Sequence, residues 1–251
     1  MKPYILEACV DSADSARIAC EAGADRLELC SGLIIGGITP SIGVFTHIRE
    51  CCDTVIRVLV RPRFGDFCYT DDEFEVIRKD ILEFKRLGAD GVVIGVLKPD
   101  GSLDIERMKL LMESAGGMKV TLHRAFDVSA DPFETLEAAV RLGIDTILTS
   151  GQKDSCLNGL KLLQELAAAA KGRIHILAAG GVCADVITKA GAAAPLTQFH
   201  MSGKETVDSS MEYRKTGVNM GIPSLSEYEI WRTKGLAIEQ AKAALLNLMP
   251  K

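Results

Sequence analysis

The stretch RLGADGVVIGV at residues 86–96 combines the signals that decide the fold of this chain. It begins with residues typical of a helix end, turns at a glycine, and continues as an apolar run that predicts a buried strand. The same order recurs in EAGADRLELC at 21–30, RLGIDTILTSG at 141–151 and KAGAAAPLTQFHMSG at 189–203. We therefore expect each helix to end at the glycine of its stretch, with a strand directly after it. These glycines are Gly23, Gly88, Gly143 and Gly191.

Further β-rich runs lie between these repeats, and each is followed by its own helical pattern. They are TVIRVLV at 54–60, MKVTLHRAF at 118–126 and RIHILAAGG at 173–181, and the chain opens with YILEACV at 4–10. The pattern thus predicts eight buried strands that alternate with amphipathic helices, which implies a parallel sheet with right-handed crossovers. At 251 residues, the chain allows about 31 residues for each of eight βα units, close to the spacing of the runs.

The polar residues at the strand ends favour a closed barrel over an open doubly wound sheet. An open sheet carries its functional groups beside one switch point and prefers a glycine-rich first turn, whereas the first turn here, CVDSADS at 9–15, has no glycine. Seven of the eight strands end in polar or glycine residues, as expected where every strand end faces one mouth. We predict an α/β fold, a single (β/α)8 TIM barrel over residues 1–251.

The last quarter of the chain departs from the repeat. Residues 206–224 show no clear period, and we expect them to form a long loop over the barrel mouth. Ser226 followed by Glu229 fits a capping box, so the last helix is predicted over residues 226–248.

Composition limits the classes of partner. The 29 Lys and Arg residues are outnumbered by 34 Asp and Glu residues, which leaves no basic footprint for nucleic acid or for an anionic membrane. The longest uncharged run, 29–48, contains four glycines and a proline, a composition that is not typical of a helix that spans a membrane. Eight cysteines without an apolar leader indicate a reducing, cytoplasmic setting.

Two cysteines and two glutamates form the first candidate site. Glu7 and Cys9 share one face of the first strand, and Glu28 and Cys30 share one face of the second, because side chains alternate along a strand. Glu7 and Glu28 are 21 residues apart, and so are Cys9 and Cys30. If the two strands are in register, each residue therefore lies beside its counterpart. Cys9 and Cys30 are then either a thiolate pair for a soft metal ion or small apolar filling of the barrel.

The glutamates allow two interpretations. Buried carboxylates are rarely left unpaired, so Glu7 and Glu28 either form ion pairs with arginines at the mouth or act as a general acid and base. The arginines in question are Arg61, Arg63 and Arg124. If the protein is an enzyme, we expect Glu7, Glu28, His123 and Asp127 to be catalytic, with His123 pointing inward.

An anion site is predicted after the last strands. Barrels often bind phosphate with backbone N–H groups and a helix N-terminus in the loops after strands seven and eight. Arginines and serines at the other strand ends would add charge and hydrogen bonds. The anion-binding candidates are Arg61, Arg63, Arg124, Ser150, Gly180, Gly181, His200 and Ser202.

At these same residues the sequence resembles the CutC family, whose members are named as copper homeostasis proteins. The matching segments are LEACVDS at 6–12, GADRLELCSGL at 23–33, GGITPS at 36–41, VRPRFGDFCYTDDE at 60–73, TLHRAFD at 121–127, LTSGQ at 148–152, FHMSG at 199–203 and SSMEYR at 209–214. The resemblance implies a (β/α)8 barrel, a cytoplasmic location and a homodimer or larger homo-oligomer. It also implies Cu(I) ligation by two cysteines, which map onto Cys9 and Cys30.

Two functional hypotheses follow. One is Cu(I) binding and copper homeostasis through Cys9 and Cys30. The alternative is an enzyme that acts on an anionic, for example phosphorylated, small molecule through the Glu, His and Arg cluster. No organic cofactor is implied by either, and the sequence leaves open whether the chain is an enzyme.

Overall fold

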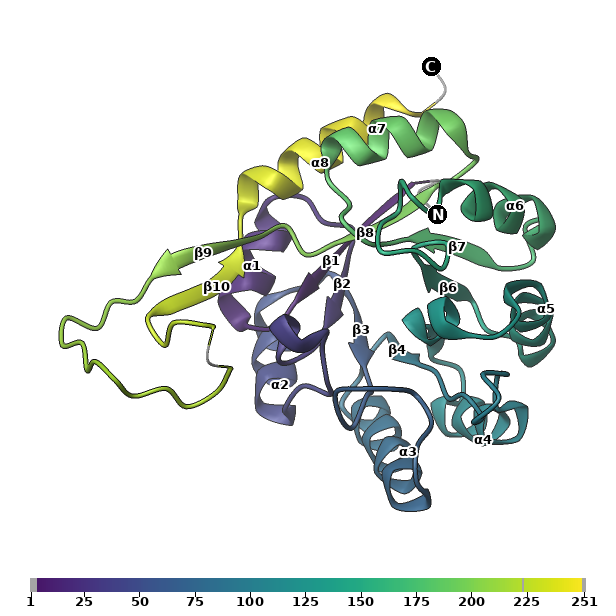
Figure 1. Cartoon of the computed structure of the whole chain (residues 1–251), viewed down its shortest axis with the longest axis horizontal. Helices are drawn as coiled ribbons and strands as arrows, with labels where there is room; N and C mark the ends of the chain where they lie inside the picture. The colour runs from purple at the N-terminus through teal and green to yellow at the C-terminus, as the bar shows by residue number, and fades with distance from the viewer. Residues whose placement is uncertain (1–3, 223, 250–251) are drawn as a thin grey trace.

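Eight parallel strands close into a barrel in the computed structural model, which describes residues 4–222 and 224–249 (Figure 1). Neighbours along the chain pair with each other, and β8 pairs with β1 to close the ring. The strands are β1 Ile5–Val10, β2 Arg26–Leu29, β3 Val55–Leu59, β4 Gly91–Ile94, β5 Lys119–Leu122, β6 Thr146–Thr149, β7 His175–Ala178 and β8 Gln198–Met201. The predicted (β/α)8 fold is confirmed.

Helices surround the barrel and cover its outer face (Figure 1). They are α1 Ala13–Glu21, α2 Ile42–Cys51, α3 Asp71–Arg86, α4 Ile105–Ala115, α5 Pro132–Leu142, α6 Leu160–Ala170, α7 Ala184–Ala193 and α8 Gly235–Asn247, with short 3-10 turns η1 Leu33–Ile35 and η2 Arg124–Val128. Local sequence sets their starts: Thr70 and Glu73 form a reciprocal capping box at α3, which satisfies two backbone donors. In the described ranges, no helix has the length and apolar character needed to cross a lipid bilayer.

The prediction that a helix ends at the glycine of its stretch is confirmed for three of the four repeats. Gly23, Gly88 and Gly143 adopt φ values of 90°, 85° and 76° next to helix ends, a conformation that favours glycine. The expectation for Gly191 is wrong, because this residue lies inside α7. There its missing Cβ leaves room for the side chain of Leu248. Close helix packing, rather than a turn, explains that glycine.

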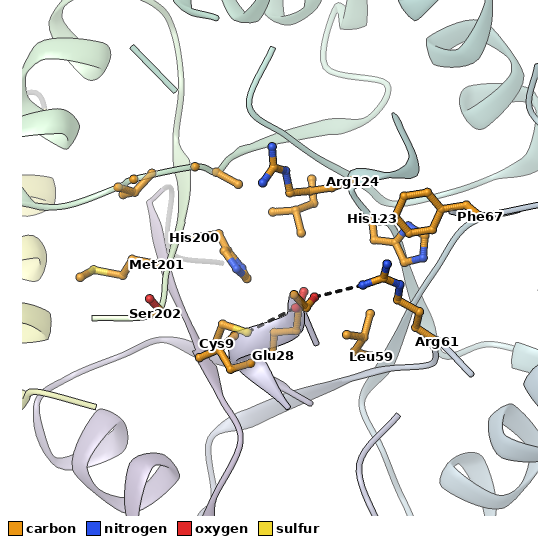
Figure 2. A pocket seen from close by; sticks show the side chains of 17 residues that line it. Cys9, Glu28, Leu59, Arg61, Phe67, His123, Arg124, His200, Met201 and Ser202 are labelled. Atoms are coloured by element: carbon orange, nitrogen blue, oxygen red, sulfur yellow. Dashed lines mark hydrogen bonds between the residues drawn. The ribbon is translucent and has the colours of Figure 1, made fainter. Parts of the chain in front are cut away.

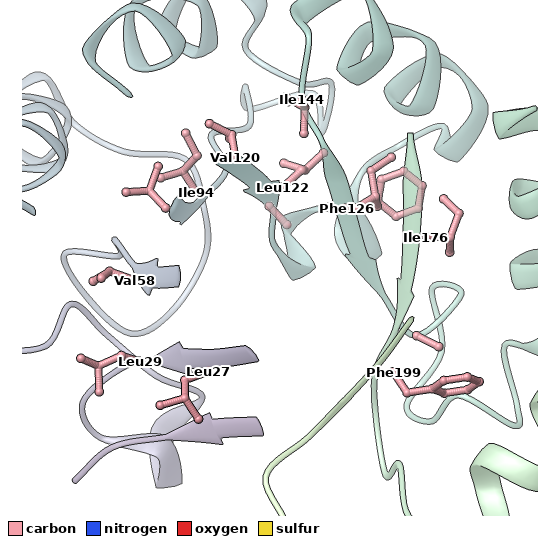
Figure 3. Close-up of a cluster of buried hydrophobic side chains, with 14 of the residues drawn as sticks. Leu27, Leu29, Val58, Ile94, Val120, Leu122, Phe126, Ile144, Ile176 and Phe199 are labelled. Atoms are coloured by element: carbon pink, nitrogen blue, oxygen red, sulfur yellow. The ribbon is translucent and has the colours of Figure 1, made fainter. Parts of the chain in front are cut away.

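The hydrophobic core lies mainly between the strands and the helices. Side chains such as Leu27, Val58 and Phe199 are fully buried there (Figure 3). The alternate strand positions point into the barrel, and many of them are polar. Arg57 donates to Thr121 Oγ1 at 2.5 Å and to Thr146 Oγ1 at 3.0 Å across the interior. The barrel interior therefore carries a buried charged layer, which includes Arg57, Arg26 and Glu7. The inward-facing residues nearer the carboxyl ends of the strands form the site described below.

The C-terminal segment differs from the prediction. Residues 229–233, expected to begin the last helix, form strand β10 Glu229–Thr233, which pairs with β9 Lys204–Asp208 in an antiparallel ribbon. The helix begins only at Gly235, so the capping-box interpretation of Ser226 and Glu229 is wrong. The described residues between β9 and β10 extend away from the barrel instead of covering the mouth (Figure 1). The sequence lacks apolar periodicity here because the ribbon is largely exposed.

Candidate functional site

A cavity of about 250 Å³ opens where the strands end at the mouth of the barrel (Figure 2). Its walls combine two thiol-bearing strands with basic and glycine-rich loops. The lining residues include Cys9, Glu28, Arg61, His123, Arg124, Gly180, Gly181, His200 and Ser202. Most of the candidate residues from distant parts of the sequence therefore meet in one pocket.

The two candidate thiols lie side by side, and Cys9 lines this cavity. Cys9 Sγ is 3.8 Å from Cys30 Sγ, and both residues are buried. The assumed register is wrong: Cys9 pairs with Glu28, an offset of 19 residues rather than 21. Strands in a closed barrel are staggered, which moves each residue of β1 past its expected neighbour. The thiols still meet because Cys30 lies one inward-facing position beyond Glu28.

Glu28 lies close to the same thiols. Cys9 Sγ donates to Glu28 Oε1 at 3.5 Å, and Glu28 Oε2 is buried without a partner in the described part of the chain. Burial raises the pKa of the Glu28 carboxyl. The pKa of the Cys9 thiol is also raised, by its hydrogen bond with Cys30 and by burial. Both groups are thus harder to deprotonate than an exposed carboxyl or thiol.

Glu7 lies deeper and is held by Arg26 and His200. Arg26 Nε donates to Glu7 Oε2, and His200 Nδ1 lies 2.8 Å from Glu7 Oε1. Burial alone would raise the pKa of the Glu7 carboxyl, but the charge of Arg26 and the bond with His200 outweigh it and keep this pKa well below its usual range. The expected pairing of Glu7 with Arg61, Arg63 or Arg124 is wrong. The stagger of the strands brings Arg26 beside it instead.

His200 connects this ion pair to the cavity. Burial would lower the pKa of the His200 imidazole, but the charge of Glu28 and the bond with Glu7 raise it. Cys9, Glu28 and His200 each offer one ligand atom, and these three atoms lie within 4.8 Å of one another. Glu7 occupies Nδ1, which leaves Nε2 of His200 available to a ligand.

His123 and Arg61 form the opposite part of the wall, with Phe67 between them. His123 is 4% exposed and points inward, as expected. The centre of its ring lies 4.7 Å from the centre of the Phe67 ring. The Arg61 guanidinium lies 4.8 Å from the centre of the same Phe67 ring. Burial and the charge of Arg61 lower the pKa of His123 to about 3, so the imidazole is neutral at physiological pH.

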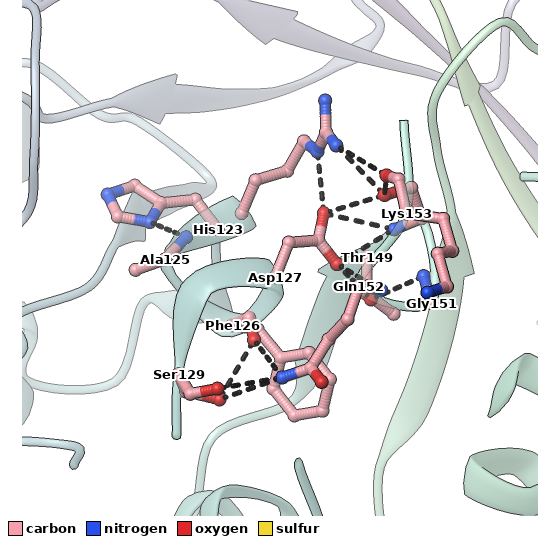
Figure 4. Close-up of polar contacts among 11 residues, drawn as sticks. His123, Ala125, Phe126, Asp127, Ser129, Thr149, Gly151, Gln152 and Lys153 are labelled. Atoms are coloured by element: carbon pink, nitrogen blue, oxygen red, sulfur yellow. Dashed lines mark hydrogen bonds and ion pairs between the residues drawn. The ribbon is translucent and has the colours of Figure 1, made fainter. Parts of the chain in front are cut away.

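Asp127 belongs to a hydrogen-bonded set behind the wall (Figure 4), and Ser150 is one of its partners. Asp127 accepts bonds from Thr149 Oγ1 at 2.5 Å and from the Ser150 amide at 3.1 Å, and it pairs with Arg124 at 2.6 Å. Neither Asp127 nor Ser150 lines the cavity. Their contacts fix the loop after β6 and hold the Arg124 side chain at the rim.

Arg63 is turned away from the cavity. It pairs with Glu73 at 2.5 Å and with Asp66 at 3.0 Å, so its charge is used within its own loop and at the start of α3. Apart from Arg63 and Ser150, the predicted anion-binding positions do line the pocket: Gly180 and Gly181 follow β7 with φ values of 92° and 69°, and Ser202 follows β8.

Sequence reasoning missed two features of this site. The predicted partners of Glu7 do not include Arg26, although Arg26 shares the inward face of its strand with Glu28 and Cys30. The prediction also places His200 in the anion site, whereas the structure brings it to the thiol cluster. Closure of β8 onto β1 brings His200 beside Glu7, a neighbour relation that eight consecutive strands in a barrel already imply.

Comparison with known proteins gives consistent results. The model of the CutC family matches residues 4–205. A CutC family protein of Bacteroides fragilis (strain YCH46) is 45% identical over 231 residues, 91% of this chain and 92% of that protein. The human protein named copper homeostasis protein cutC homolog is 41% identical over 247 residues, 98% of this chain and 90% of its own.

Solved structures also match. The structure of the putative copper homeostasis protein CutC from Streptococcus agalactiae superposes with a TM-score of 0.76 at 29% identity, and the match covers 79% of this chain and 98% of that one. Thiamine phosphate pyrophosphorylase from Pyrococcus furiosus, at 15% identity and a TM-score of 0.58 over 99% of this chain and 98% of its own, shares the barrel fold.

Proposed function

This chain belongs to the CutC family, and we propose from that premise that it serves copper homeostasis by binding Cu(I) at the barrel mouth through Cys9 and Cys30. Relatives named as copper homeostasis proteins support the general role. The observation that carries the proposal for this chain is the pair of buried sulfur atoms 3.8 Å apart.

The donor set suits a soft ion. Metal–sulfur bonds are about 2.3 Å long, so one ion can contact two sulfur atoms up to about 4.6 Å apart. The 3.8 Å between Cys9 Sγ and Cys30 Sγ falls within that reach. Thiolate ligands select Cu(I) or Zn(II) over hard cations, and the reducing compartment that we predict for this protein favours Cu(I).

His200 supplies the third candidate ligand. Imidazole suits copper better than carboxylate does, which favours His200 over Glu28. Histidines that bind metals usually give their second ring nitrogen to a carboxylate, and Glu7 fills this position at 2.8 Å from Nδ1. Arg26 holds Glu7 in turn. The buried charged layer thus orients the imidazole, while the burial of both thiols limits access of water and oxidants.

Anaerobic titration with Cu(I) against a chelator of known affinity tests the proposal. We expect Cys9→Ser and Cys30→Ser each to lose high-affinity binding of one ion. The loss should exceed the roughly 10- to 100-fold that removal of an outer-shell partner causes. Cys51→Ser is the matched control, because Cys51 is exposed on α2, outside the pocket lining. Unchanged copper uptake by the Cys9→Ser, Cys30→Ser double variant would contradict the proposal.

A further inference from the structure

The cavity is larger than a metal site requires and has cationic and donor groups that the thiols do not use. Its volume is about 250 Å³, whereas an ion held by Cys9, Cys30 and His200 needs only their ligand atoms. Arg61 and Arg124 line the walls, and Glu28 is the single acidic residue among the described lining residues. The pocket therefore combines the room for a small organic molecule with an excess of positive charge.

Arg61 is a buried cation without an acidic partner. The residue is 8% exposed, and within residues 4–222 and 224–249 no carboxylate oxygen lies within salt-bridge distance of it. Its guanidinium donates instead to the backbone oxygens of Gly37 at 3.1 Å and Gly65 at 2.5 Å, and its Nε has no partner. Buried charges are normally paired, so this wall has an unmet preference for an anion.

His123 adds a donor with a fixed tautomer. Its Nδ1 accepts the amide of Ala125 at 3.2 Å, so the neutral ring carries its proton on Nε2. Nε2 is buried and has no hydrogen-bond partner among the described residues. A buried donor that is left unpaired is unfavourable, and a ligand oxygen at the cavity wall would satisfy it.

The facing wall is the N-terminus of α7. The N-cap residue Cys183 makes no side-chain cap, and within the described ranges the amides of Gly181 and Val182 donate to no protein acceptor. Gly181, Val182 and Ser202 all line the cavity. Free amides at a helix N-terminus, together with the helix dipole, favour a phosphate group, and this is the place where barrels commonly bind one.

We propose that the pocket binds a small phosphorylated molecule, with its phosphate at the N-terminus of α7 and Ser202 and a second oxygen-rich group, such as a carboxylate, at Arg61 and His123. The two sets of donors lie on different walls, so the ligand must carry oxygen atoms at both ends. The site shares its cavity with Cys9 and His200, but its donors are other residues and it needs no metal.

Binding of two probe molecules to the metal-free protein tests the proposal. Glycerol 3-phosphate offers the phosphate end alone, whereas 3-phosphoglycerate adds a carboxylate. Isothermal titration and thermal unfolding should both detect binding, with 3-phosphoglycerate the tighter ligand by about 10-fold or more, the usual effect of a charge-assisted hydrogen bond.

Variants assign the two ends. Ser202→Asp places a negative charge beside the phosphate position and should weaken both probes at least about 10-fold, whereas Ser202→Asn, its neutral match in size, should weaken them less. Arg61→Met should make the two probes bind equally. Because Arg61 also supports its loop, His123→Asn serves as a second variant and should reduce the preference for 3-phosphoglycerate.

Three outcomes would overturn the proposal: no binding of either probe, equal binding of both by the unmodified protein, or binding that Ser202→Asp leaves unchanged. Cu(I) titration of Ser202→Asp separates this result from the copper proposal, since the thiols are intact in that variant.

Discussion

Lowering the pH from 7 to 5 should destabilise this protein through His123, and an Asn at this position should remove that part of the effect. The imidazole is buried beside Arg61, and its pKa in the folded state is about 3. In the unfolded chain a histidine titrates near pH 6.5. Between these values the unfolded state binds one more proton than the folded state, so acid favours unfolding.

The magnitude follows from the two pKa values. Each pH unit within this window changes the free energy of unfolding by about 1.4 kcal/mol. Because the unfolded histidine is still partly neutral between pH 7 and 6.5, the full change from pH 7 to pH 5 is about 2 kcal/mol. The contribution of His123 is therefore fully favourable above about pH 7.5 and declines as the pH falls toward 3.

Urea unfolding at pH 7 and pH 5, followed by far-UV circular dichroism, measures this change. Other groups also titrate, so the informative quantity is the difference between proteins. His123→Asn keeps an acceptor near the Ala125 amide and should lose about 2 kcal/mol less stability over this range than the unmodified protein. His47→Asn, at an exposed position on α2, is the control and should behave like the unmodified protein. An equal loss for His123→Asn would refute the assignment of a buried neutral imidazole.

Two further predictions concern stability and assembly. Arg26→Met leaves the Glu7 carboxylate buried without its main partner and should lower the free energy of unfolding by about 3–5 kcal/mol. Arg17→Met removes only an exposed pair with Glu21 and should leave the free energy of unfolding nearly unchanged. Equal losses for the two variants in urea unfolding would contradict this prediction. We also predict a homodimer or larger homo-oligomer, supported by apolar side chains such as Tyr213 and Met220, 70% and 80% exposed on the segment between β9 and β10. Light scattering should give at least twice the 27.0 kDa chain mass, and a monomer at all concentrations would contradict it.

The sequence predicts the barrel because the signals that define it are local and repeated. A glycine after a helix, followed by an apolar run, specifies a βα unit wherever it occurs, and polar strand ends indicate which edge forms the mouth. The same rule fails at Gly191, since a glycine required for close helix packing looks identical in sequence to one required by a turn. It also gives no warning that residues 229–233 pair as a ribbon strand, because an exposed strand lacks the apolar alternation of a buried one.

The site is harder to predict because it depends on relations between strands. Periodicity places Glu7, Cys9, Glu28 and Cys30 on inward faces, but the stagger of the closed barrel determines that Glu7 lies beside Arg26 and that Cys9 lies beside Glu28. An offset of two residues therefore changes which charge pairs with which. The position of His200 depends in addition on the pairing of the first strand with the last.

Closure of β8 onto β1 also has a consequence for the newly made chain. β1 is synthesised first, but its partner on one edge, Gln198–Met201, follows nearly 200 residues later. At typical rates of about 5–20 residues per second, that edge stays open on the ribosome for roughly 10–40 s. During this interval Glu7 has no His200 to contact, and the Cys9 thiol is open to metals and oxidants in the cell. The first strand thus keeps an unpaired edge for longer than any other strand of the barrel.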